Sequence, residues 1–173
     1  PERVLLSGSH DATLVAVTGQ AEQVTVTGVT LREGRADAAV TEDGLTGGGG
    51  LRCTAGEVWL RDVRVTDSLA GLGGGIYASD GCDLTLDGVT VDGSTAHHGG
   101  GIYASDAAGL TITDSLIQDN TADSSVEADR FKEGEDHAFG GGLYLYGLNG
   151  ALLRDTTLAR NTITHEAVSY THL

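Results

Sequence analysis

Apolar and polar residues alternate along short stretches of this chain, and the same stretch recurs at a fixed spacing. Val58–Val65 reads VWLRDVRV, and similar segments start 26 and 52 positions later, at Leu84–Val91 and Leu110–Ile117. Val24–Leu31 is the earliest copy and Ala151–Leu158 is the last. Each copy has a break of Asp, Gly or Ser between two alternating pieces. Because period-2 alternation is typical of strands and small polar residues of turns, each copy predicts two short strands that meet at a corner.

A run of glycines precedes these segments and repeats with the same spacing. Gly73–Asp80 and Gly99–Asp106 are the same eight residues, GGGIYASD, 26 positions apart. Gly140–Tyr144 is a third copy, and Gly47–Leu51 is a degraded earlier one. No segment between the copies shows helical periodicity, and a repeat of this length is typical of a stacked coil. We therefore predict an all-β fold, a single-stranded parallel β-helix (solenoid) of about 5–6 coils with roughly 26 residues each.

In such a coil, equivalent strands of successive turns pair in parallel at a spacing of about 4.8 Å, so like side chains form ladders. The predicted inward ladders are Ile76, Ile102 and Leu143; Val26, Leu60, Leu86, Ile112 and Leu153; and Leu31, Val65, Val91, Ile117 and Leu158. Asn120 and Asn161 share one register with Ser68 and Ser94. Asn suits a turn, and stacked Asn side chains are expected to hydrogen-bond from coil to coil.

Two segments lengthen the repeat. Residues 35–46 extend the first corner, and residues 123–137 (DSSVEADRFKEGEDH) add 15 residues between Asn120 and Gly140. Insertions into solenoids form loops on one face, which is often the binding face. A tolerated excursion without a role is the alternative.

The ends of the chain predict a fragment of a longer protein. The chain contains no methionine, and Val168–Leu173 matches the translation of a transposase end that is used to prepare sequencing libraries. Such added segments are excluded from fold reasoning. We expect the β-helix to occupy residues 1–167 of an environmental sequence, and residues 168–173 to be foreign to it.

Charge narrows the choice of partners. The net charge is −15, with 25 acidic residues against 10 basic ones, and Lys132 is the single lysine. Nucleic acids and anionic membranes are bound by basic patches, so neither is an expected partner. No apolar run is long enough to span a bilayer, so no direct membrane insertion is expected. The acidity suits solubility in an exposed setting, and the alternative is that some carboxylates bind Ca²⁺.

One repeat unit resembles a known family. Leu116–Ala122 (LIQDNTA) and the later Gly140–Leu143 (GGGL) resemble the repeats of bacterial polymorphic outer-membrane proteins, in which an Asn-containing piece alternates with a Gly-Gly-Ala-Ile-like piece. Leu116 or Thr157 stands where that family has an aromatic residue. The resemblance covers about residues 47–163 and implies the pectin-lyase-like fold, in which the parallel β-helix is right-handed.

The resemblance also implies a role and a location. It implies a secreted or surface-exposed bacterial stalk or adhesin, extracellular or at the outer membrane, without chemistry of its own. Carbohydrate, or a host or cell-surface protein, is then the expected partner, and no cofactor is expected.

Histidines form the best candidate cluster for chemistry. His97 and His98 precede one glycine run as His137 precedes the next. An offset of 41 positions places them on adjacent coils, near Glu135 and Asp136. Such a cluster could bind a transition metal or carry out acid–base chemistry, although histidines at exposed corners more often do neither.

Tyrosines and aspartates supply two further candidates. Tyr77, Tyr103 and Tyr144 each follow an inward Ile or Leu and are expected to point outward, either as a platform for sugars or as a ladder that covers the sheet. Asp80 and Asp106 share a register and could bind one Ca²⁺, with a structural role at a turn as the alternative. The nonapeptide of calcium-binding β-rolls is absent.

No residue is assigned as catalytic. β-Helices also house polysaccharide lyases and glycosidases, so the alternative function is a fragment of a polysaccharide-active enzyme, although the Asn-Thr-Asp and Gly-His-Gly motifs of such enzymes are absent. Cys53 and Cys82 are the only cysteines and lie on neighbouring coils. They form a disulfide if the protein is exported, or they remain free thiols.

Overall fold

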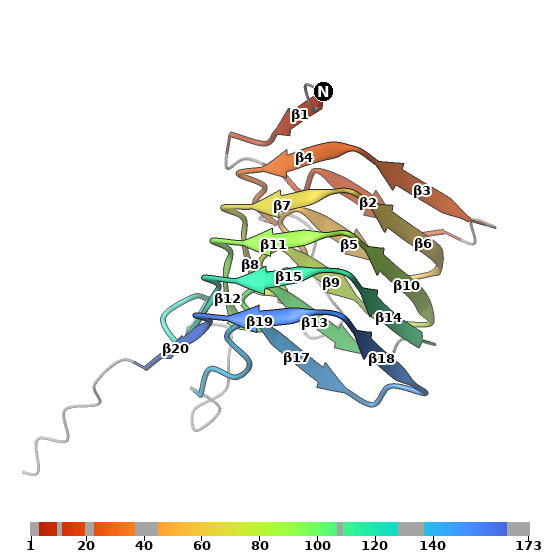
Figure 1. Cartoon of the computed structure of the whole chain (residues 1–173). Coiled ribbons are helices and arrows are strands. Elements are labelled where there is room, and N and C mark those ends of the chain that lie inside the picture. Colours follow the sequence, from red (N-terminus) through yellow and green to blue (C-terminus); the bar gives the residue numbers. More distant parts are fainter. Residues whose placement is uncertain are drawn as a thin grey trace, which may run out of the picture.

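Stacked parallel strands make up the regular structure of this protein (Figure 1). The computed structural model describes residues 4–9, 12–19, 23–36, 45–106, 109–127 and 137–165. Within these ranges twenty strands form four sheets, which we name I to IV in the order in which each coil passes through them. No helix in the described part of the chain could cross a membrane.

Sheets I and II carry the glycine-run strands and the first half of each alternating segment. Sheet I contains β2 (Val15–Val17), β5 (Leu51–Cys53), β9 (Ile76–Ala78), β13 (Ile102–Ser105) and β17 (Leu143–Tyr146). Sheet II contains β3 (Val24–Thr27), β6 (Gly56–Arg61), β10 (Cys82–Asp87), β14 (Gly109–Thr113) and β18 (Ala151–Arg154).

Sheets III and IV carry the second half of each segment and the stretch that returns to the next glycine run. Sheet III contains β1 (Val4–Ser7), β4 (Val29–Arg32), β7 (Arg64–Thr66), β11 (Thr90–Asp92), β15 (Leu116–Gln118) and β19 (Thr157–Ala159). Sheet IV contains β8 (Leu69–Leu72), β12 (Thr95–His98), β16 (Thr121–Asp123) and β20 (Thr162–Thr164).

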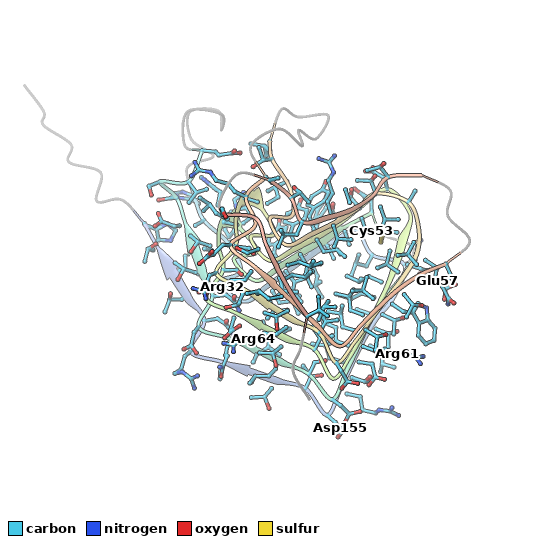
Figure 2. The ribbon with its side chains drawn as sticks, turned by 90° about the horizontal axis from the view of Figure 1, so that it is seen from above. Arg32, Cys53, Glu57, Arg61, Arg64 and Asp155 are labelled. Atoms are coloured by element: carbon cyan, nitrogen blue, oxygen red, sulfur yellow. A yellow bond between two sulfur atoms is a disulfide. The ribbon has the colours of Figure 1, made fainter. Side chains whose placement is uncertain are left out.

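Like residues stack on like residues across neighbouring coils, as the sequence predicts. Every strand pair is parallel, and Ile102 pairs with Ile76 on one side and with Leu143 on the other. In sheet II, Leu86 pairs with Leu60 and Ile112 in the same way. Figure 2 shows Glu57 and Arg61 on the outer side of this sheet, away from the coil interior. The predicted β-helix and its three inward ladders are confirmed.

Sheet IV is the part of the coil that the sequence pattern did not reveal. Its repeated apolar residues are Ala70, Ala96 and Ala122, which pair across β8, β12 and β16 and are buried. Alanine is small and common in many settings, so this ladder gives no alternation of large apolar and polar residues. The coil therefore has four sheets, where the pattern indicated three.

Each coil turns at corners where single residues adopt a left-handed backbone conformation. The corner between sheets II and III stacks Gly28, Asp62, Gly88, Asp114 and Asp155, with φ of 50–68°. Gly has no Cβ to clash in this conformation, and Asp tolerates it better than most residues do. Figure 2 shows Asp155 at this corner. Part of the acidity of the chain thus comes from aspartates that form corners.

A buried polar ladder lies beside the glycine runs. Asn120 accepts a hydrogen bond from the Ser94 N–H at 3.0 Å, and its amide donates to the Val91 carbonyl at 3.0 Å and to Asn161 Oδ1 at 3.1 Å. The predicted bonds from coil to coil are confirmed. A Cβ at Gly101 would lie only 2.9 Å from the Asn120 amide nitrogen, so the third glycine of the run makes room for this ladder.

A disulfide joins two consecutive coils. Cys53 ends β5 and Cys82 begins β10, their sulfur atoms are bonded, and their Cα atoms are 5.9 Å apart. Both side chains are fully buried in the main core. Of the two alternatives that the sequence left open, the structure contains the disulfide.

Both insertions interrupt sheet IV. The first insertion lies between Arg35, which pairs with Leu69, and Gly47, which pairs with Leu72. It therefore interrupts a strand of sheet IV, whereas the sequence predicted that it lengthens a corner. The second follows β16, because Asp123 still pairs with Thr164 and the ladder resumes where Phe139 pairs with His98. Its bounds are therefore 124–138, one residue later than the sequence indicated.

Candidate functional site

The second insertion begins with a short strap, Ser124–Glu127, that folds back over sheet IV. A turn closes where the Val126 N–H donates to the Asp123 carbonyl at 3.1 Å. The Asp123 carboxylate accepts the Ser125 N–H at 2.9 Å and the Ser125 hydroxyl at 2.7 Å. Although burial opposes ionisation, hydrogen bonds from Ser125 and Thr164 hold the pKa of Asp123 below its ordinary value. The short polar side chains of this turn thus set the direction of the strap.

Glu127 clamps the strap onto a coil that lies far away in the sequence. Its Oε1 accepts the Thr46 hydroxyl at 2.8 Å, and its Oε2 accepts the Thr46 N–H at 3.2 Å. The Thr46 hydroxyl oxygen also accepts the Gly71 N–H at 2.8 Å. A Cβ at Gly71 would collide with the Glu127 carboxylate, so the absence of a side chain there admits the clamp.

The strap and the first insertion border one cavity of about 200 Å³ on the outer side of sheet IV. Its polar lining includes Arg35, Thr46, Ser125 and Glu127. Its apolar lining consists of Ala36, Leu69, Ala70 and Val126. We call this surface, from Arg35–Ala36 and Thr46 across β8 to Ser124–Glu127, the insertion face. A guanidinium, a carboxylate and hydroxyl groups above an apolar floor can bind small polar groups.

His97 and His98 lie at the foot of the strap but are not an exposed pair. His97 is fully buried, and its Nδ1 donates to the Val126 carbonyl at 2.9 Å, so it supports the strap. His98 packs edge-on against His97, with ring centroids 4.6 Å apart, and also contacts Phe139 and Tyr144. Burial, followed by the neighbouring His97, lowers the pKa of His98 to about 4. His98 is therefore neutral at pH 7 and packs as an aromatic side chain.

His137 does not join the two earlier histidines. Its ring contacts His165 instead, with the centroids 6.0 Å apart and the planes at 84°. The predicted neighbours Glu135 and Asp136 lie outside the described residues. The offset of 41 positions is correct, since Phe139 pairs with His98. The cluster divides because the strap buries His97, whose ring bonds the Val126 carbonyl and not His137.

The tyrosines form a stacked column on the outer side of sheet I. Ring centroids are 5.5 Å apart for Tyr77 and Tyr103 and 5.1 Å apart for Tyr103 and Tyr144. Arg52 lies over Tyr77, and only 5% of Tyr77 is exposed. Burial raises the pKa of Tyr103 to about 12. Because the rings stack on one another, the arrangement fits a ladder that covers the sheet better than an open platform for sugars.

Asp80 and Asp106 lie at the corner that follows sheet I, with φ of 56° and 45°. The Asp80 carboxylate accepts the Ser79 hydroxyl at 2.6 Å. Across the described residues no group of three or more His, Cys, Asp or Glu side chains could hold a metal ion. A structural role explains both aspartates, and calcium binding by them stays a prediction.

The sequence indicated the insertion but missed the features that make it a site. Sheet IV, the clamp between Glu127 and Thr46, and the cavity residue Arg35 were not predicted. The available signal was the recurrence of Thr95 and Thr121 at 26 positions, which marks the outer ladder of sheet IV. No pattern links residues 46 and 127, because the strap crosses the coils and does not follow them.

A family model described as a right-handed β-helix region matches residues 13–171. No curated protein and no solved structure matches the chain. The matched range includes every strand except β1.

Proposed function

The chain belongs to the right-handed β-helix family, and from that premise we propose that it is a non-catalytic binding module of a secreted or cell-surface bacterial protein. The rigid coil stack serves as a stalk, and the insertion face holds the partner. Binding residues on loops that a rigid scaffold positions are a common arrangement in proteins.

The clamp between Glu127 and Thr46 is the observation that carries this proposal. It joins residues 81 positions apart and holds the strap against sheet IV beside the root of the first insertion. An insertion without a role needs no such attachment. A loop held in place before binding loses less conformational freedom when a partner arrives, which favours affinity.

The disulfide and the charge support the location and the partner class. Disulfides persist in oxidising compartments, so the bond between Cys53 and Cys82 favours export. With a net charge of −15, carbohydrate or a cell-surface protein is a better partner than nucleic acid. The guanidinium and carboxylate of the cavity suit the polar groups of either partner.

A binding screen with matched variants tests the proposal. The labelled full chain is applied to arrays of neutral and acidic polysaccharides and to cells, next to Glu127→Ala and Glu57→Ala. Glu57 is the control, since it lies on the outer side of sheet II and bonds Trp59 there. We expect Glu127→Ala to weaken binding and Glu57→Ala to leave it unchanged. Equal binding by all three proteins contradicts the proposal.

The alternative function, a polysaccharide-active enzyme fragment, rests on the cavity that places Arg35 and Glu127 in one lining. A base and a carboxylate in one cleft are among the groups that lyases and glycosidases use. The same array, assayed for new reducing ends and for unsaturated products, separates the two functions. Cleavage that disappears in Glu127→Ala establishes the enzyme and refutes the non-catalytic module.

A further inference from the structure

An exposed pair of histidines closes the base of the second insertion. His137 lies on the limb that returns from the insertion, two residues before Phe139 restores the ladder. His165 directly follows β20 on the last described coil. Both residues are exposed, and their rings touch although the residues are 28 positions apart. We propose that His137 and His165 bind a divalent transition-metal ion such as Zn²⁺, Cu²⁺ or Ni²⁺.

The geometry fits one shared ion. Imidazole nitrogens bind Zn²⁺ at about 2.0–2.1 Å, which places the centroids of two ligating rings about 5–6 Å apart. The observed separation is 6.0 Å, and the planes are nearly perpendicular, at 84°. Exposed side chains can rotate to bring one nitrogen of each ring to the ion. Imidazole is a preferred ligand for these metals, whereas Ca²⁺ and Mg²⁺ prefer oxygen.

Water completes the coordination. No third His, Cys, Asp or Glu of the described residues joins the pair. Asp123, on the strand that pairs with β20, is already engaged by the Ser125 N–H and hydroxyl. Two protein ligands bind more weakly than the four of a structural zinc site, so the ion exchanges with solvent.

Such an ion would tie the returning limb of the insertion to the coil stack. The strap already fixes the outgoing limb through Glu127 and Thr46, and the ion would fix the other limb through His137 and His165. The insertion would then be held at both ends of its base. This inference does not depend on the proposed binding function, because it concerns only these two residues.

Zn²⁺ titration of the chelator-treated full chain by calorimetry tests the site. We expect one binding event that is lost in both His137→Gln and His165→Gln. His10→Gln is the matched control, since His10 stands in the sequence between β1 and β2, far along the chain from His137 and His165. His172→Gln tests whether a histidine in the last residues supplies a ligand. Circular dichroism of the metal-free variants checks that each one folds.

Proteolysis gives a second readout of the same site. Trypsin is specific for the peptide bonds that follow arginine and lysine, and Arg130 and Lys132 both stand inside the insertion. We expect Zn²⁺ to slow this cleavage in the natural chain and in His10→Gln, and to leave it unchanged in His165→Gln. The proposal is overturned if the natural chain binds no Zn²⁺, if His165→Gln still binds it, or if His10→Gln or His172→Gln loses it.

Discussion

Side chains inside the coil have two different roles, apolar packing and hydrogen bonding between coils. Most fill the interior as apolar ladders, but Asn120 is a fully buried polar residue that bonds the coil on either side of its own. A buried polar group is stable only when its hydrogen bonds are made, so such residues fix the register of a stack as well as its stability.

Asn120→Ala is expected to destabilise the protein by about 1–3 kcal/mol, because the buried Ser94 N–H loses its acceptor. Asn161→Ala, at the same register on the last described coil, is the matched comparison. Asn161→Ala should destabilise the protein less, since Asn161 is partly exposed and water can replace its hydrogen bonds. Urea unfolding of both variants gives the two free energies. Equal losses would show that the ladder adds no stability beyond local bonds.

His98 makes stability depend on pH. Its pKa is about 4 in the fold, against the ordinary 6.5, so between these values the unfolded chain binds a proton that the fold does not. Stability should therefore fall as pH drops from about 6.5 towards about 4, and this effect should be absent above that window. His98→Gln removes the titrating group, so its free energy of unfolding should fall less steeply with acid. Parallel pH profiles for the two proteins would contradict this assignment.

At the scale of elements, the glycine runs and the corner residues shape the coil. The strands are short, and sheets I and IV meet at a glycine with φ of 58–72° in each repeat: Gly48, Gly73, Gly99 and Gly140. The third glycine of each run then passes close to the coil below. A Cβ at Gly101 would lie 2.6 Å from the Gly142 carbonyl oxygen, which is backbone and cannot move away easily.

Gly101→Ala should thus destabilise the fold by about 1–3 kcal/mol or more through overpacking between coils. Gly150→Ala is the matched control, because a Cβ there meets nothing within 4 Å. Thermal unfolding of the two variants provides the comparison. If both variants have the melting temperature of the natural chain, close contact between coils does not explain why the third position of the run is glycine.

At the scale of the whole molecule, the core is a column whose inward side chains become more exposed to solvent towards its ends. In one inward ladder Leu86 is fully buried, whereas Leu153, on the last described coil, is 39% exposed. Each coil of a solenoid contacts only its neighbours, so stability depends on nearest-neighbour interfaces.

Leu86→Ala is accordingly expected to lower the free energy of unfolding by about 2–5 kcal/mol, as for other buried leucines. Leu153→Ala, at the same register, should cost clearly less because its side chain is already partly hydrated. Denaturant unfolding measures both. Equal losses in the free energy of unfolding at the two positions would mean that the core responds as one globular unit.

The disulfide acts on the whole chain by restricting its unfolded state. The bond spans 29 positions, and in the chain-entropy model a loop of this length stabilises the fold by about 3–4 kcal/mol. Cys53→Ala/Cys82→Ala should therefore unfold at a lower denaturant concentration than the oxidised protein. The reduced natural chain should resemble this double variant. An unchanged midpoint in both would show that the coil stack alone sets the stability.

Chemical likeness at a fixed spacing made the architecture predictable. The 26-residue period and the parallel register follow from which residues recur, because a slip by one position would turn every apolar side chain outward. The pairs Ile76 with Ile102 and Leu86 with Ile112 therefore followed from the sequence alone. The same reasoning failed for sheet IV, whose alanine ladder leaves no strong alternation.

By itself, then, the sequence determined the coil, its inward ladders and the existence and approximate place of the insertions. Only the tertiary structure decided that Glu127 meets Thr46, that Cys53 reaches Cys82, and that His137 meets His165 while His97 is buried. The physical reason is that the ladders repeat a local pattern, whereas these contacts join unlike residues. Such contacts form where a strap crosses the coils or a corner brings two side chains together, and no periodicity records them.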